Sequence, residues 1–155
     1  MMKMKKIWFA VAVFCGVFTL AGAELSVGGW KIHTGQGKFT YNVTQYPLLI
    51  SCQTPTADKD GNLGVWGRVY RVEKLETGKK YEIKVTYKLT DSPKGAIAVW
   101  VRGADNFNLF GRASANAKTL QRQFTASKEN VSIYINLREG TGNLEVISAE
   151  LNPVE

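Results

Sequence analysis

Three segments of the chain alternate apolar and polar residues, and their polar positions carry groups that could bind a ligand. In segments 96–102, 131–138 and 66–72, successive side chains point to opposite faces of an extended strand, so the apolar positions form one face. The other positions form the opposite face. We predict that this face is a ligand-binding surface if the segments lie in one concave sheet. Its residues would be Arg68, Tyr70, Trp100, Arg102, Tyr134, Asn136 and Arg138.

These side-chain types suit the recognition of a sugar. An aromatic ring can cover the apolar C–H face of a pyranose, while fixed donors and acceptors bind its hydroxyl groups. Arginines would also suit a uronic or sulfated sugar, through bidentate bonds to the anion. A purely structural role stays open. A loop could cover Trp100, and Tyr70 and Tyr134 could pack against one another across strands.

The sequence favours a protein that is not an enzyme. It contains one histidine, His33, and neither a Ser-His-Asp set nor a metal-ligand cluster is recognisable. The acidic segment 58–62 lacks an EF-hand pattern, because Leu63 and Val69 occupy the positions of the required glycine and glutamate. We therefore predict no catalytic residue, metal or cofactor. A jelly-roll polysaccharide lyase that uses Tyr, Arg and His is the enzyme alternative.

Short strand-like runs, separated by turn residues, recur along the chain after residue 23. Segment 81–89 is the clearest, because five apolar side chains alternate with polar ones, and Gly78 supplies the conformational freedom of the turn before it. No segment after residue 23 shows helical periodicity over ten residues. These patterns predict an all-β fold, a jelly-roll β-sandwich of two antiparallel sheets with about eight strands. The expected strands are 38–43, 48–52, 65–72, 81–89, 96–102, 119–125, 131–138 and 144–151.

The order of several motifs resembles a known family. The turn Leu-Glu-Thr-Gly-Lys-Lys-Tyr at 75–81 lies between two strands, and Gln-Arg-Gln-Phe-Thr-Ala-Ser at 121–127 precedes another. With the closing segment 142–151, this order resembles the carbohydrate-binding-module-like, galactose-binding-domain-like jelly rolls of secreted bacterial proteins. The resemblance spans nearly the whole chain after residue 23. It implies a polysaccharide or oligosaccharide ligand.

One departure from that family concerns calcium. The family often ends in an Asp-Asp/Asn-Val-x-Leu tract whose acidic residue helps to hold a structural calcium ion. Here the matching residues, 147–151, read Ile-Ser-Ala-Glu-Leu and contain no aspartate. We therefore predict that the fold does not require calcium.

Residues 1–23 have the features of a secretory signal peptide. A basic start is followed by the uncharged apolar segment 7–20 and by the small-residue cleavage site at 21–23. The apolar segment is shorter than the ~20 residues of a spanning helix, although an uncleaved anchor is the alternative. We predict cleavage after Ala23, a single domain at 24–155, and a secreted or periplasmic protein that leaves the membrane after cleavage.

Charge and cysteine content narrow the possible partners. Of 20 basic residues, three lie in the predicted signal peptide, which leaves 17 against 13 acidic residues, a scattered excess of four that does not indicate nucleic-acid binding. Cys52 is the one cysteine outside that segment, so we expect a buried thiol, with an intermolecular bridge as the alternative.

Two functions of different class follow from these observations. The first is a non-catalytic, secreted carbohydrate-binding domain that recognises a polysaccharide through aromatic and polar residues on one sheet. The second is a structural or protein-interaction jelly-roll domain of the bacterial envelope, with an envelope protein as its partner.

Overall fold

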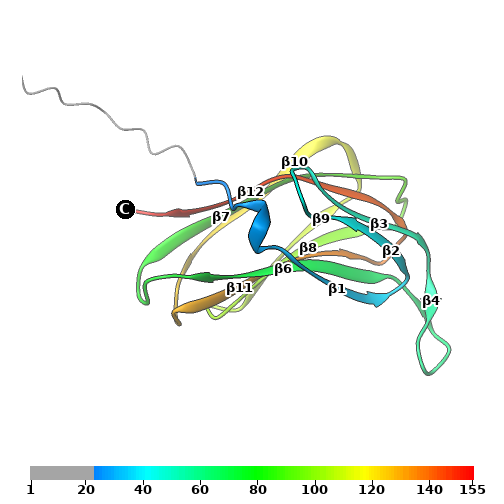
Figure 1. Cartoon of the computed structure of the whole chain (residues 1–155), viewed down its shortest axis with the longest axis horizontal. Helices are drawn as coiled ribbons and strands as arrows, with labels where there is room; N and C mark the ends of the chain where they lie inside the picture. The colour runs from blue at the N-terminus through cyan, green and yellow to red at the C-terminus, as the bar shows by residue number, and fades with distance from the viewer. Residues whose placement is uncertain (1–22) are drawn as a thin grey trace, which may run out of the picture.

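The computed structural model describes residues 23–155, which form two five-stranded antiparallel sheets packed face to face (Figure 1). The predicted signal peptide lies outside the described residues, apart from Ala23. A single turn of 3-10 helix, η1 (Val27–Gly29), precedes the first strand. Within residues 23–155, no helix is long and apolar enough to cross a membrane.

Sheet I has the strand order β1-β6-β11-β8-β9. Its strands are β1 (Lys31–Gln36), β6 (Trp66–Lys74), β11 (Asn130–Arg138), β8 (Ala96–Arg102) and β9 (Phe107–Arg112).

Sheet II has the order β10-β7-β12-β3-β2. Its strands are β10 (Ser114–Thr125), β7 (Lys80–Thr90), β12 (Gly142–Pro153), β3 (Leu48–Thr54) and β2 (Lys38–Asn42).

The predicted all-β sandwich of two antiparallel sheets is confirmed, but the number of strands was underestimated. The described residues contain twelve strands rather than about eight. The additional ones are β1, β9 and the small hairpin of β4 (Thr56–Ala57) and β5 (Leu63–Gly64), which projects from one end of the sandwich (Figure 1). Strand β1 is almost entirely exposed, so it carries no apolar alternation that the sequence could reveal.

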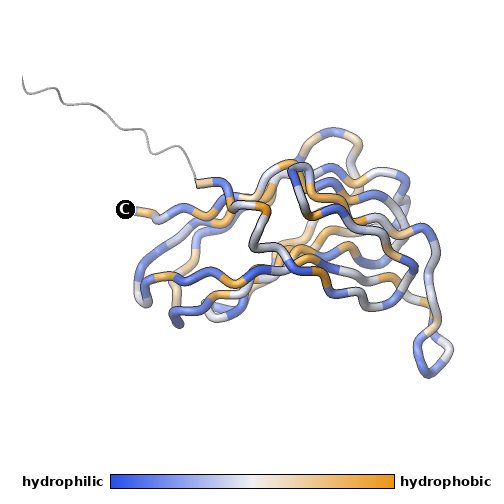
Figure 2. Tube along the Cα trace, in the orientation of Figure 1, coloured by the Kyte–Doolittle hydropathy of each residue, from blue (hydrophilic) through white to orange (hydrophobic). Residues whose placement is uncertain are grey.

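Alternation along the strands builds the core between the sheets. In β7, the predicted apolar face from Tyr81 to Leu89 is buried at every second position, and the residues between are half-buried. Val99 of β8 and Ile133 and Ile135 of β11 are fully buried on the inner face of sheet I, as predicted. Figure 2 shows the resulting alternation of apolar and polar positions along the strands. Because the inner face is apolar, the polar positions of the same strands must face outward.

Cys52 lies in the core on β3, as predicted. Its thiol is buried and unpaired, and burial raises its pKa above the ordinary value for cysteine. A buried thiol that stays protonated is a poor nucleophile.

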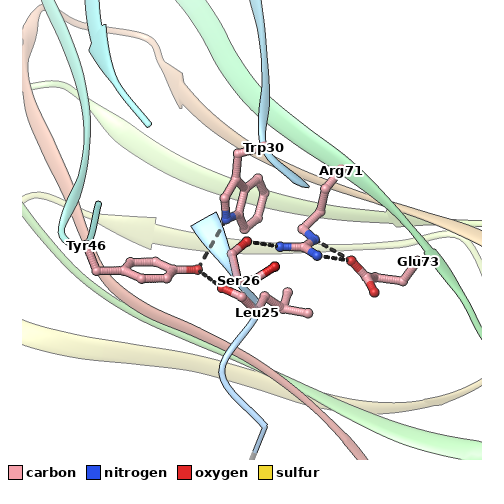
Figure 3. A network of polar contacts seen from close by, with 6 residues as sticks. All are labelled: Leu25, Ser26, Trp30, Tyr46, Arg71 and Glu73. Atoms are coloured by element: carbon pink, nitrogen blue, oxygen red, sulfur yellow. Dashed lines mark hydrogen bonds and ion pairs between the residues drawn. The ribbon is translucent and has the colours of Figure 1, made fainter. Parts of the chain in front are cut away.

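A buried polar network closes the end of the sandwich near the N-terminal segment. Figure 3 shows Arg71, on the inner face of β6, donating to the Ser26 carbonyl and pairing with the carboxylate of Glu73. The Arg71 guanidinium carbon also lies 5.3 Å from the centre of the buried Trp30 ring. Trp30 Nε1 donates to the Tyr46 hydroxyl at 3.2 Å, and that hydroxyl donates to the Leu25 carbonyl at 2.8 Å. The network thereby ties the segment before β1 to the body of the domain.

The turn between β6 and β7 provides a test of backbone strain. Gly78 has φ of 85°, and a Cβ added there would meet no atom within 4 Å. A Gly78→Val variant should therefore lose about 1–3 kcal/mol of unfolding free energy through conformation alone. Thermal melts would measure the loss. Gly28→Val is the matched control, because Gly28 is equally unobstructed and its φ is not positive. Equal melting temperatures for the two variants would contradict the assignment.

Candidate functional site

All seven residues of the predicted surface lie on the outer face of sheet I. Arg68 of β6 pairs with Asn136 of β11, which pairs with Ala98 of β8. In the adjacent row, Tyr134 of β11 pairs with Trp100 of β8 and with Tyr70 of β6. Residues directly opposite one another in antiparallel strands project to the same face. Arg102 and Arg138 occupy the corresponding outward positions of the rows on either side.

Trp100 is the centre of this surface. Its side chain is half-buried, and three guanidinium carbons surround its ring, with Arg138 at 5.3 Å, Arg102 at 5.4 Å and Arg68 at 6.0 Å from the ring centre. Such contacts hold a guanidinium by its attraction to the π-electrons and leave its N–H groups free for other acceptors. The tryptophan ring therefore positions arginines as well as offering its own surface.

Arg68 is fixed from several sides. Its Nε and Nη2 donate to His33 Nδ1 of β1 at 3.1 and 2.7 Å. Its guanidinium carbon lies 4.8 Å from the Tyr134 ring centre and 5.5 Å from that of Trp66. Because a guanidinium group only donates, His33 Nδ1 must be the acceptor in this pair.

Arg102 and Arg138 differ in how firmly they are held. Arg102 donates through Nη1 to the carbonyls of Val101 and Phe107, at 3.0 and 3.1 Å, and through Nη2 to Asn108 Oδ1 at 2.8 Å. Within residues 23–155, Arg138 makes neither a hydrogen bond nor an ion pair through its side chain. Its guanidinium group therefore keeps its full set of donors for a ligand.

Tyr70 and Tyr134 pack against each other. Their ring centres are 5.7 Å apart and their planes differ by 23°, which is a stacked arrangement. The structural role that the sequence left open thus accounts for one face of each ring. Both side chains remain half-buried, so part of each ring still borders the surface.

A small pocket of about 160 Å³ opens in this surface. Its lining residues are Trp66, Arg68, Trp100, Asn136 and Arg138.

Asn136 requires a correction to the sequence prediction. It was expected as a solvent-facing binding residue, but it is only 1% exposed and forms part of the pocket wall. The reason is that larger side chains surround it on the outer face. Asn136 Nδ2 donates to the Ala98 carbonyl at 2.9 Å, whereas Asn136 Oδ1 and Trp100 Nε1 are buried without a hydrogen-bond partner among the described residues. A buried acceptor and a buried donor beside one pocket are suited to a polar ligand.

Three residues of the surface were missing from the predicted set. His33 was missed because β1 lacks the alternation of apolar and polar residues that would reveal which side chains face outward. The His33 ring contacts the Trp66 ring edge-on, with ring centres 5.4 Å apart. Phe110 of β9 pairs with Ala98 and is 59% exposed, so it offers an open ring at the edge of the surface. Trp66 alternates with Arg68 and Tyr70 along the same strand, so the sequence pattern could have predicted that Trp66 also lies on this face. The ring of Trp66 lies against Gly35, where an added Cβ would come within 2.1 Å of it.

The acidic turn at 58–62 forms the tip of the β4–β5 hairpin (Figure 1), and the Asn62 carbonyl accepts a hydrogen bond from Gln36 Nε2 of β1 at 2.8 Å. Asp58 Oδ1 accepts the backbone N–H groups of Asp60 and Asn62, both at 2.9 Å. The Asn62 N–H is the main cause that lowers the pKa of the Asp58 carboxyl group. The carboxylate therefore caps its own turn.

Calcium should not affect the stability of the domain. Within residues 23–155, no group of three or more His, Cys, Asp or Glu side chains is arranged to hold a metal ion. We expect thermal melts with calcium and with a chelator to coincide. A fall of several degrees on chelation would show that carbonyl or amide oxygens, rather than a carboxylate cluster, form a calcium site.

Comparisons with known proteins identify the fold. No family model matches the chain, and no curated protein matches its sequence. Among solved structures, a CBM4 module has a TM-score of 0.59 at 18% identity, covering 83% of this chain and 89% of that one. The module TmCBM61, solved with β-1,4-galactotriose, has a TM-score of 0.58 at 12% identity, covering 81% and 88%.

A third solved structure extends this agreement. The N-terminal cellulose-binding domain of β-1,4-glucanase C from Cellulomonas fimi has a TM-score of 0.55 at 14% identity, covering 82% of this chain and 90% of that one. Each of the three similarities extends over most of both chains. The chain therefore has the jelly-roll fold of carbohydrate-binding modules.

Proposed function

We propose that the protein is a non-catalytic carbohydrate-binding domain that binds a polysaccharide on the outer face of sheet I. The main support is the pocket beside Trp100, where a buried N–H donor and the buried Asn136 carbonyl oxygen lack partners. A sugar hydroxyl both donates and accepts, so hydroxyl groups that displace the side chains covering these two solvent-inaccessible atoms would satisfy both of them. The fold neighbours include a domain named as cellulose-binding and a module solved in complex with β-1,4-galactotriose, which favours the same class of ligand.

The surface is long enough for several sugar residues. The row from His33 to Phe110 crosses all five strands of sheet I, which corresponds to about 19 Å at the usual strand spacing. The surface is recessed in the middle of this row, where Asn136 and Ala98 are buried, whereas Phe110 at one end of the row is exposed. We infer that the glycan chain crosses the strands, with one sugar at the pocket and a neighbouring sugar on the Phe110 ring.

Binding should be weak for each site. A few hydroxyl contacts and one exposed ring correspond to dissociation constants on the order of micromolar to millimolar. Such affinity suits a domain that holds a polymer through repeated contacts. The export implied by residues 1–23 would place the domain where extracellular polysaccharides occur.

A glycan-array screen of the purified protein, followed by titration with the best ligand, tests this function. Phe110→Ala should weaken binding at least tenfold and leave the melting temperature nearly unchanged, since its ring is exposed. Leu63→Ala is the matched control, because Leu63 is 74% exposed but lies on the β4–β5 hairpin. Absence of binding to any glycan would count against the proposal and favour the alternative, an envelope protein-interaction domain.

A further inference from the structure

The outer face of sheet I has a one-sided distribution of charge. Its outward positions carry basic side chains, and within residues 23–155 none of these positions carries a carboxylate. The basic side chains are those of Lys31, Arg68, Lys74, Arg102, Arg112 and Arg138. The residues outside the predicted signal peptide include 13 acidic side chains, so their absence from one whole face is a property of the surface rather than of the composition.

The arginines around Trp100 are not neutralised by the protein. Among residues 23–155, ion pairs engage Arg71 with Glu73 and Arg112 with Glu139, but no carboxylate lies within ion-pair distance of Arg68, Arg102 or Arg138. Aromatic rings, a histidine nitrogen and neutral oxygens hold two of these three guanidinium groups in place, and the Trp100 ring holds Arg138. The three positive charges around the Trp100 ring repel one another, and a bound anion would offset this repulsion.

The pocket has the size and the donors for one oxyanion. Arg68 and Arg138 both line it, its volume of about 160 Å³ fits a single substituent, and the buried Trp100 N–H has no acceptor. A carboxylate or sulfate accepts bidentate bonds from a guanidinium group and can accept one more from the indole. The remaining unpartnered atom, Asn136 Oδ1, needs a donor, which a neighbouring sugar hydroxyl supplies.

We propose that the polysaccharide bound here is anionic, with a carboxylate or sulfate group seated between Arg68 and Arg138 against the Trp100 N–H. This inference rests on the proposed function and specifies its ligand class. Arg68, which His33 and Tyr134 hold in position, provides the fixed side of the anion site. Arg138, which lacks polar partners in the described part of the chain, provides the adaptable side.

Paired polymers that share a sugar backbone and differ in charge provide the test. We would titrate the purified protein with polygalacturonate and its methyl ester, and with dextran sulfate and dextran, at low and at physiological salt. The charged member of at least one pair should bind more than tenfold tighter, and salt should weaken it. The pair that responds distinguishes a carboxylate from a sulfate. Polyglutamate, which carries carboxylates without sugars, should bind much more weakly.

Variants locate the anion site. Arg138→Gln and Arg68→Gln should each weaken binding of the charged polymer at least tenfold, and by a larger factor than they weaken binding of its neutral counterpart. Arg138→Lys should keep part of the affinity, since it retains the charge but loses the bidentate fork. Arg122→Gln is the matched control, because Arg122 is an exposed arginine on β10 of the other sheet.

The outcomes separate this proposal from the one on which it depends. Equal binding of charged and neutral polymers would overturn the anionic ligand and leave carbohydrate binding intact. Equal binding of polyglutamate, or an equal loss in Arg122→Gln, would overturn the anion site as a specific feature of this face. Absence of binding to every polymer and to a glycan array would overturn both proposals.

Discussion

Replacing Trp100 with alanine should strongly weaken glycan binding. The substitution removes the ring at the centre of the surface, the unpartnered N–H beside the pocket, and the contact that positions Arg68, Arg102 and Arg138. We expect the dissociation constant to rise by more than a hundredfold, about 2.7 kcal/mol. Isothermal titration with the best ligand from the array would measure the change. The ring is half-buried, so the variant should also lose about 1–2 kcal/mol of stability.

A second substitution separates recognition from packing. Trp100→Phe keeps an aromatic ring for the guanidinium groups but has no N–H donor. It should bind more weakly than the unaltered protein and more tightly than Trp100→Ala, with a melting temperature close to the unaltered value. Unaltered affinity in Trp100→Ala, measured below its melting temperature, would show that the ring takes no part in binding.

Replacing Arg71 with methionine should have the largest effect on stability. Arg71 is 7% exposed, pairs with Glu73, donates to the Ser26 carbonyl and contacts the Trp30 ring (Figure 3). The substitution leaves the mostly buried Glu73 carboxylate and the Ser26 carbonyl without their donor. Removing one partner of a buried ion pair costs on the order of 3 kcal/mol. Chemical denaturation monitored by tryptophan fluorescence would measure this loss.

The double variant Arg71→Met/Glu73→Gln is the informative comparison. It removes both charges, so it should be more stable than the single variant by at least about 1 kcal/mol. Lys74→Met is the control, because Lys74 is exposed and its nearest carboxylate, that of Glu129, is 3.9 Å away. A double variant less stable than the single one would show that the ion pair is not the source of the effect.

The sequence predicted the fold well wherever one face of a strand is buried. The alternating residues of β7, β8 and β11 face the core as expected, because burial imposes a period of two on such strands. It failed at β1, at β9 and at the β4–β5 hairpin. Those segments are short or largely exposed, so pairing with a neighbour, rather than their own hydrophobicity, defines them.

The sequence predicted which face of the sheet carries the candidate site, but not how deeply each of its side chains is buried. Alternation placed Arg68, Trp100 and Arg138 on one face, and the strand register brings them together. Alternation could not reveal that Asn136 is covered or that His33 holds Arg68, because both facts depend on neighbouring strands. Burial on an outer face depends on the size of the surrounding side chains, which a pattern within one strand does not contain.

The most direct test of carbohydrate binding on sheet I is to follow the indole N–H resonances of tryptophan by NMR during titration with the best glycan from the array. Trp100 Nε1 has no partner in the described structure, whereas Trp30 does not line the pocket and its Nε1 already donates to the Tyr46 hydroxyl. We predict that the Trp100 resonance shifts progressively with glycan concentration while that of Trp30 stays fixed. Binding that leaves the Trp100 resonance unchanged, or that shifts Trp30 instead, would contradict the proposed site.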